Sequence, residues 1–266
     1  MRVTNYRILG DLGGGRFEAE HAVLPRRAVI KTIPDALAWM KGLRVAVMRE
    51  ACILEALQHP GVARLYETGL FEDGRPWFAC EDVEGTALSD LRRQLGLAEL
   101  VALMRDVADV LAHAHRRGII HGGLHPDRII LTERAFPIVI DDWSTARAHD
   151  APAAVPSVPR PDARRFQAPE LACGDAIDDR ADVYALGAIA KAALPTNAPA
   201  ALVRLIEQMM AADRWDRPAI TEVRAALETI PTTAMQTRWT PAFGVPSKSD
   251  DSDEVTQEEV ILVELS

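Results

Sequence analysis

One stretch of the sequence decides how the rest is interpreted: residues 119–131, which read IIHGGLHPDRIIL. It follows a predicted amphipathic helix, residues 97–117, whose end is marked by Gly118. It leads into two β-branched runs, 129–131 and 138–140, which predict a short hairpin. A long helix, a polar loop and a hairpin are therefore expected to follow one another along the chain.

Upstream of this stretch, the sequence has the pattern of short strands around one helix. Strands are predicted at residues 6–9, 27–32, 65–67 and 77–80. A glycine cluster, residues 13–15, separates the first two strands. A helix is predicted across 35–58, because apolar residues recur there at helical spacing until a His-Pro-Gly sequence ends it.

Downstream of residue 86 the pattern becomes mainly helical. Two or three further helices are predicted, across residues 180–193, 198–212 and 219–229. Residues 146–167 are rich in Ala, Pro and Arg and predict a long loop, whereas residues 231–266 have the acidic, turn-forming composition of a flexible tail. The fold class expected from the pattern is α+β, with a β-rich part followed by a helical part.

The formal net charge of −9 is unevenly distributed along the chain. Seven acidic residues and no Lys or Arg lie in residues 250–266, so removing this segment leaves −2 for the rest. A surface that binds nucleic acid or an anionic membrane needs an excess of basic residues. We therefore expect neither nucleic acid nor a membrane as a partner.

Cysteine usage and hydropathy indicate the compartment. Cys52, Cys80 and Cys173 are too far apart for a C-x-x-C motif, and an odd number of cysteines is typical of a reducing compartment. Residues 1–11 lack the apolar run of a signal peptide, and the longest apolar-rich stretch, 183–194, is too short to span a bilayer. We expect a soluble, cytoplasmic protein.

Residues 119–131 resemble the catalytic loop H-R-D-L-K-P-x-N-I-L of the eukaryotic-type Ser/Thr protein kinase family, and they are even closer to the H-G-D-L-H-P form of related phosphotransferases. The resemblance implies one bilobal protein-kinase-like domain, residues 1–230. Its small β-rich N-lobe would span about residues 1–80, and its helical C-lobe about residues 86–230. The segment 187–202 is short for the family, so we expect the C-lobe to be shortened after its central helix.

The glycine cluster resembles the family's G-x-G-x-x-G loop, which covers the ATP phosphates because only glycine lets the backbone approach so closely. Gly13 and Gly15 match the first two glycines, and both are predicted to bind nucleotide. Glu18 replaces the third, and its negative charge should weaken the lid. Without this context, a glycine cluster between strands would indicate only a hairpin turn.

Two further segments resemble the nucleotide-binding parts of the N-lobe. Residues 28–31 resemble the V-A-I-K strand, which assigns Val29 and Lys31 to the nucleotide, with Glu50 as the ion-pair partner of the lysine.

Residues 77–85 resemble the hinge between the lobes. Cys80 would lie behind the adenine, and the backbone at Glu81 and Val83 would face the adenine edge. Ile130 matches the residue below the adenine ring.

The catalytic loop departs from the family at three chemical positions. Gly123 stands where the family has the Asp that accepts the substrate proton, and Arg128 stands where an Asn binds a second Mg²⁺. An arginine is a permanent cation and cannot be a metal ligand. His125 replaces the Lys that contacts the transferring phosphoryl group. No catalytic residue is therefore expected to be intact.

Residues 140–144 resemble the D-F-G region and assign Asp142 to Mg²⁺. A shift of one residue would assign Asp141 instead, and two aspartates after a strand are also typical of a plain turn.

Two structural motifs of the family are also present. Glu170 of the A-P-E motif is expected to pair with Arg217, and residues 182–187 resemble the D-V-W-S-L-G helix.

The resemblance favours a pseudokinase that acts as a regulatory or scaffold module through protein partners. ATP is the implied cofactor, because Lys31, Glu50 and Asp142 are present, and Mg²⁺ binding is expected to be weakened. Arg128 could instead neutralise phosphate directly. The alternative is a weakly active or unconventional phosphotransferase in which Asp127 or Asp141 stands in as the base.

A third hypothesis is an adaptor whose partner-binding element is the acidic segment 250–266. This segment contains the apolar run 260–263, which could bind a partner or add a strand to the protein's own sheet. A solvated tail explains the same composition equally well.

Overall fold

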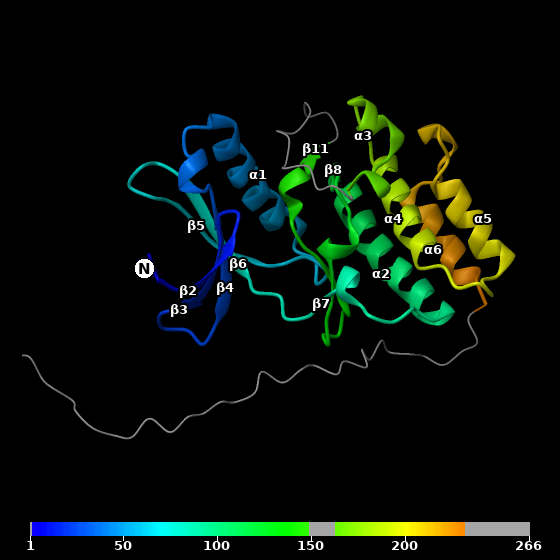
Figure 1. The fold of residues 1–266 in the computed structure, drawn as a ribbon, viewed down its shortest axis with the longest axis horizontal. Coiled ribbons are helices and arrows are strands. Elements are labelled where there is room, and N and C mark those ends of the chain that lie inside the picture. The colour runs from blue at the N-terminus through cyan, green and yellow to red at the C-terminus, as the bar shows by residue number, and fades with distance from the viewer. Residues whose placement is uncertain (1, 149–162, 232–266) are drawn as a thin grey trace, which may run out of the picture.

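The N-terminal part of the molecule is an antiparallel sheet (Figure 1). The computed structural model describes residues 2–148 and 163–231. The strand order is β1-β2-β3-β4-β6-β5. Their bounds are β1 (Arg2–Val3), β2 (Tyr6–Gly13), β3 (Arg16–His21), β4 (Arg27–Thr32), β5 (Leu65–Leu70) and β6 (Pro76–Glu81).

The two faces of the sheet differ because successive side chains on a strand point to opposite sides. On β4, Val29 belongs to the main hydrophobic core, and Lys31 on the same face reaches helix α1 (Lys41–Leu57). Ala28 and Ile30 belong to a separate, smaller cluster on the other face. Helix α1 therefore covers the face that carries Lys31.

The helix predicted across 35–58 is wrong at its N-terminal end. Residues Asp35–Leu37 form a 3₁₀ turn, and Met40 has an extended backbone with ψ of 97°, which separates this turn from α1. The C-terminal end is confirmed. Gln58 adopts a left-handed conformation with φ of 34°, and Pro60 follows, so the helix cannot continue.

The C-terminal part is a group of packed helices, as Figure 1 shows. They are α2 (Leu97–His115), α3 (Pro169–Cys173), α4 (Arg180–Ala192), α5 (Ala200–Met209) and α6 (Ile220–Thr229). Helix α2 packs against α4 and α6, and α4 also packs against α5. Among the described residues, no helix has both the length and the apolar character needed to cross a membrane.

Two small sheets hold the polar loops in place. Strand β9 (Ile129–Leu131) pairs with β10 (Ile138–Ile140) and with β7 (Thr86–Ala87), and β8 (Ile119–Ile120) pairs with β11 (Arg147–Ala148). The loop 121–128 runs from β8 to β9, and the loop 141–146 runs from β10 to β11. Because the flanking strands pair with one another, the two loops are held side by side.

The predicted fold class is confirmed: the molecule is α+β, with an N-terminal antiparallel sheet and a helical C-terminal part. The four predicted N-terminal strands, the 129–140 hairpin and the helices near 97, 180, 200 and 220 are all present. Strand β3, the short strands β1, β7, β8 and β11, and helix α3 were not predicted. Most of the predicted loop 146–167 and almost all of the predicted tail 231–266 lie outside the described residues.

Candidate nucleotide site

The conformation of the loop 121–128 is set by one buried carboxylate. Asp182 of α4 accepts hydrogen bonds from the backbone N–H groups of His121 and Gly122, at 2.9 and 2.8 Å. Its other contact is His115 Nε2 at 2.8 Å. Burial would raise the pKa of Asp182, but the hydrogen bond and charge of His115 outweigh it and lower the pKa. Asp182 is therefore held as an anion that orients the loop.

Lys31 and Glu50 form a buried ion pair between β4 and α1. Lys31 Nζ lies 2.7 Å from Glu50 Oε1, and the two side chains are 9% and 6% exposed. Burial alone would lower the pKa of Lys31, but the negative charges of Glu50, Asp141 and Asp142 outweigh burial and raise it. The structure thus places together the lysine and the glutamate that the sequence paired.

The two candidate aspartates face different cations. Asp142 lies toward Lys31, with its Oδ1 3.9 Å from Nζ, and its backbone is left-handed with φ of 58°. Asp141 instead pairs with Arg16 of β3, with Nη2 3.4 Å from Oδ2. The geometry therefore favours Asp142 as the carboxylate at the lysine, and it gives Asp141 a contact between the glycine turn and the C-terminal part.

Arg128 lies within the site as a buried cation that joins both loops. Its Nη2 is 2.9 Å from Asp142 Oδ2, and its side chain is only 12% exposed. Its Nη1 donates to the carbonyl of Gly123 at 3.0 Å and to the Thr145 hydroxyl at 3.2 Å. Burial would raise the pKa of Asp142, but the nearby Lys31 and Arg128 outweigh burial and hold it well below its usual range.

Gly123 has no room for a side chain in this arrangement. A Cβ built at this position would lie 2.5 Å from Thr145 Oγ1 and 2.9 Å from Arg128 Nη1. The Thr145 hydroxyl is itself fixed, because it donates to the carbonyl of His121 at 3.0 Å. Threonine and arginine therefore fill the space into which an aspartate at position 123 would extend.

His125 is turned toward its own loop. Its Nδ1 hydrogen-bonds the carboxylate of Asp127, and its ring packs edge-on against Phe166, with centroids 4.8 Å apart. The side chain is buried. In this conformation His125 acts as an anchor of the loop.

The glycine cluster forms a tight hairpin turn between β2 and β3. Gly13 pairs with Arg16 across the turn, and the two residues between them both have positive φ. The amide of Gly13 donates to Asp11 Oδ1 at 2.7 Å, and the carbonyl of Gly15 accepts from the Thr32 amide at 2.8 Å. Gly13 and Gly15 remain predicted nucleotide ligands, but the Gly13 amide must leave Asp11 before it can donate to phosphate.

The hinge segment lies between β6 and β7. Cys80 is buried, and burial raises the pKa of its thiol to about 12. The Glu81 amide donates to the carbonyl of Arg64 at 2.9 Å, whereas among the described residues the Val83 amide donates to no acceptor. Ile130 is half-buried on β9. Glu81, Val83 and Ile130 remain predicted contacts of the adenine.

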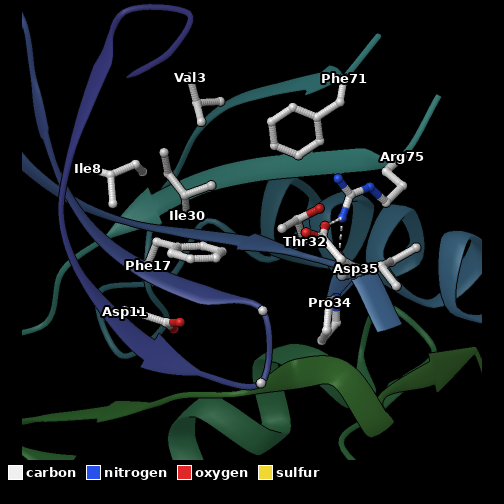
Figure 2. Close-up of a pocket in the computed structure, with 13 residues that line it drawn as sticks. Val3, Ile8, Asp11, Phe17, Ile30, Thr32, Pro34, Asp35, Phe71 and Arg75 are labelled. Atoms are coloured by element: carbon white, nitrogen blue, oxygen red, sulfur yellow. Dashed lines mark hydrogen bonds and ion pairs between the residues drawn. The ribbon is translucent and has the colours of Figure 1, made fainter. Parts of the chain in front are cut away.

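A cavity of about 390 Å³ lies on the other face of the sheet. Figure 2 shows Phe17, Ile30 and Phe71 around it, with the ion pair between Arg75 and Asp35 at its edge. Ile30 is adjacent to Lys31 on β4, so its side chain points away from the lysine. The cavity therefore lies on the face of the sheet opposite to Lys31, although Gly14 and Gly15 of the glycine turn also line it.

The sheet, the buried Lys–Glu pair and the two adjacent polar loops together define a protein kinase domain. Residues 6–201 match the family described as "Protein kinase domain", so the chain belongs to this family. Members of the family use ATP and Mg²⁺.

Several bacterial serine/threonine-protein kinases are similar to this chain. PknJ of Mycobacterium tuberculosis is 30% identical over 205 residues, which cover 74% of this chain and 35% of PknJ. PknD of the same species is 29% identical over 214 residues, or 79% of this chain and 32% of PknD. The DNA damage-responsive kinase RqkA of Deinococcus radiodurans is 31% identical over 193 residues, or 69% and 29%. The chain spans about a third of the length of these curated relatives.

The residues present do not fit the divalent metal that the family uses. Mg²⁺ requires oxygen ligands at about 2.0–2.1 Å in octahedral geometry. Asp142 is the predicted ligand, but its carboxylate already lies between Lys31 and Arg128. The position that would add a second oxygen ligand carries the guanidinium of Arg128.

Sequence reasoning missed two residues of the site. Thr145 fills the space beside Gly123, and Arg16 joins the glycine turn to Asp141. The only available signal for Arg16 was a basic residue directly after the glycine cluster. Thr145 has no signal, because its role depends on the pairing of β8 with β11.

Proposed function

We propose that this protein kinase domain is a pseudokinase, which binds nucleotide and protein partners but lacks ordinary phosphotransfer. One observation supports this function above the others: the space at Gly123 is filled by Thr145 and Arg128. A kinase needs a carboxylate there to accept the proton of the substrate hydroxyl. Loss of a general base typically costs about 10²–10⁴ in rate.

The two aspartates that could substitute for this base are both engaged. Asp127 is hydrogen-bonded to His125, and Asp141 is paired with Arg16. Each would have to leave a cationic or hydrogen-bonding partner before it could accept a proton from an incoming hydroxyl. The geometry therefore ranks the weakly active phosphotransferase below the pseudokinase.

Nucleotide binding is supported by the groups that remain in place. The ion pair between Lys31 and Glu50 is complete, with 2.7 Å between the charged atoms, and Lys31 lies 3.9 Å from Asp142. A lysine held in this way can contact a phosphate, while the Val83 amide can bind an adenine edge. Val29 and Ile130 would supply the apolar contacts.

A phosphotransfer assay tests the proposal. The full chain is incubated with γ-labelled ATP, Mg²⁺ or Mn²⁺ and a general protein substrate, beside Lys31→Ala and Asp142→Ala. The proposal predicts the same background signal for all three proteins. Activity that both substitutions abolish would show an active kinase and refute the pseudokinase assignment.

Regulatory binding is proposed to involve the C-terminal segment 250–266, which lies outside the described residues. Its support is compositional: acidic side chains alternate with an apolar run, as in short recognition segments. Deleting residues 246–266 tests this role by partner capture and thermal stability. We expect loss of partner capture at unchanged stability. A fall in stability alone would mean that the segment docks on its own domain.

A further inference from the structure

We propose that the site binds a nucleoside triphosphate without a divalent cation, and that the guanidinium of Arg128 provides the positive charge. This inference rests on the proposed nucleotide binding. It concerns the charge that the triphosphate meets in the site, and therefore whether the bound form is the free nucleotide or its metal complex.

The first observation is that Arg128 already holds Asp142. A guanidinium nitrogen lies 2.9 Å from Oδ2, while Lys31 lies 3.9 Å from Oδ1. A divalent ion on Asp142 would stand within a few ångströms of two fixed positive charges in a poorly solvated site. Repulsion between like charges at such distances is strong, because a poorly solvated site screens it less than bulk water does. Arginine and metal therefore compete for one carboxylate.

The second observation is that hydrogen-bond donors remain unused. The Nε atoms of Arg128 and Arg16 are buried, and among the described residues neither has a partner. A buried donor without an acceptor is unfavourable, because it has lost its hydrogen bonds to water without replacing them. Arginine side chains suit phosphate because several N–H groups project from one planar group. Both donors are therefore available to an anionic ligand with many acceptor oxygens.

The third observation is the charge balance of the site. The cations Arg16, Lys31 and Arg128 are matched by the anions Asp141, Glu50 and Asp142, and the three pairs are separated by 3.4, 2.7 and 2.9 Å. These three pairs are thus balanced without a metal. A free triphosphate carries more negative charge than its metal complex. A cationic side chain that turns from a carboxylate to phosphate therefore attracts the free triphosphate more strongly than the metal complex.

The experiment measures ATP binding to the full chain by calorimetry, either in EDTA or with an excess of Mg²⁺. The wild-type protein is compared with Arg128→Asn and with a matched control, Arg224→Asn. Arg224 pairs with Asp109 on the surface, where both side chains are more than one third exposed. AMP serves as the second ligand, because it lacks the β- and γ-phosphates and reports on an intact adenine site.

We expect the wild-type protein and Arg224→Asn to bind ATP in EDTA at least as tightly as in Mg²⁺. Arg128→Asn should lose about tenfold or more in affinity for metal-free ATP, because a hydrogen bond to a charged group is worth about 1.5–3 kcal/mol. Its affinity for AMP should be unchanged, and its ATP binding should now depend on Mg²⁺.

Two results would overturn the inference. If wild-type protein binds ATP only with Mg²⁺, the inference fails while the proposed nucleotide binding stands. If neither ATP nor AMP binds under either condition, the proposed nucleotide binding fails and the inference fails with it.

Discussion

Two groups of residues in the C-terminal part relate differently to the protein kinase motifs. We call Asp182 and the pair Glu170–Arg217 the framework, and Gly123 and Arg128 the centre. In the framework, Asp182 and the pair Glu170–Arg217 keep the residues of the motifs. The pair makes the predicted contact, and Asp182 accepts a hydrogen bond from the loop. In the centre, Gly123 and Arg128 depart from the motifs, and the side chains of Arg128 and Thr145 fill the space beside Gly123.

This difference shows which charges the fold itself requires. Arg217 is fully buried and makes two hydrogen bonds to Glu170, at 2.7 and 2.9 Å, so losing either residue leaves an uncompensated charge in the interior. In the centre, Arg128 pairs with Asp142 without a ligand, so this charge is balanced although the residue at position 128 departs from the motif. The fold can therefore persist while the centre changes, and the comparison can be tested residue by residue.

The largest effect is expected from breaking the framework. Arg217→Ala should lower the free energy of unfolding by about 3–5 kcal/mol, because it strands the carboxylate of Glu170 in the interior. Urea denaturation measures this change. Arg224→Ala is the control, since its ion pair with Asp109 is largely exposed, and it should cost about 0–1 kcal/mol. Equal losses for the two variants would remove the distinction between framework and surface charges.

His121 connects the framework to the centre, because its amide donates to Asp182 and its carbonyl accepts from Thr145. The protonation of its side chain should therefore affect the stability of the fold. Burial lowers its pKa from 6.5 to about 4, so the unfolded chain binds a proton at higher pH than the folded protein. The stability that neutral His121 contributes is present above pH 6.5 and is lost as the pH falls toward 4. The loss is on the order of 3 kcal/mol.

His121→Phe should remove this part of the acid sensitivity while keeping the aromatic contact with Trp143. Unfolding free energies between pH 7 and 4 measure the slope. A variant as acid-sensitive as the wild-type protein would show that His121 is protonated in the folded state.

The packing at Gly123 should have an intermediate effect. Gly123→Ala places a Cβ against the Thr145 hydroxyl and the Arg128 guanidinium, and overpacking of this kind costs about 1–3 kcal/mol. In a Thr145→Ala background the same substitution should cost less, giving a coupling energy of about 1 kcal/mol. Thermal or urea denaturation of the four proteins completes the cycle. Strict additivity would show that the space at Gly123 is open.

The smallest effect is expected from the contact between the glycine turn and the C-terminal part. Arg16→Gln removes the 3.4 Å ion pair with Asp141, but the arginine side chain is 42% exposed. Solvent screening should keep the loss below about 1 kcal/mol. Denaturation measures it, and a loss above 2 kcal/mol would mean that this contact holds the two parts of the molecule together.

The sequence predicted the fold from local signals that the structure reproduces. Strand β4 has β-branched residues, α2 has helical apolar spacing, and the β9–β10 hairpin has two β-branched runs. The strands β7, β8 and β11 have two residues each, too few for any periodicity, so they were missed. The pairing of Lys31 with Glu50 followed from motifs, whereas the contact of Thr145 with Arg128 depends on tertiary packing that no spacing encodes.

The proposed replacement of the metal by Arg128 is tested most directly in a crystal grown with ATP and an excess of Mn²⁺, whose anomalous scattering marks its position. The account predicts no Mn²⁺ within coordination distance of Asp142, with the Arg128 guanidinium in hydrogen-bond contact with that carboxylate or with phosphate. Mn²⁺ bound to Asp142, with Arg128 turned away, would contradict it.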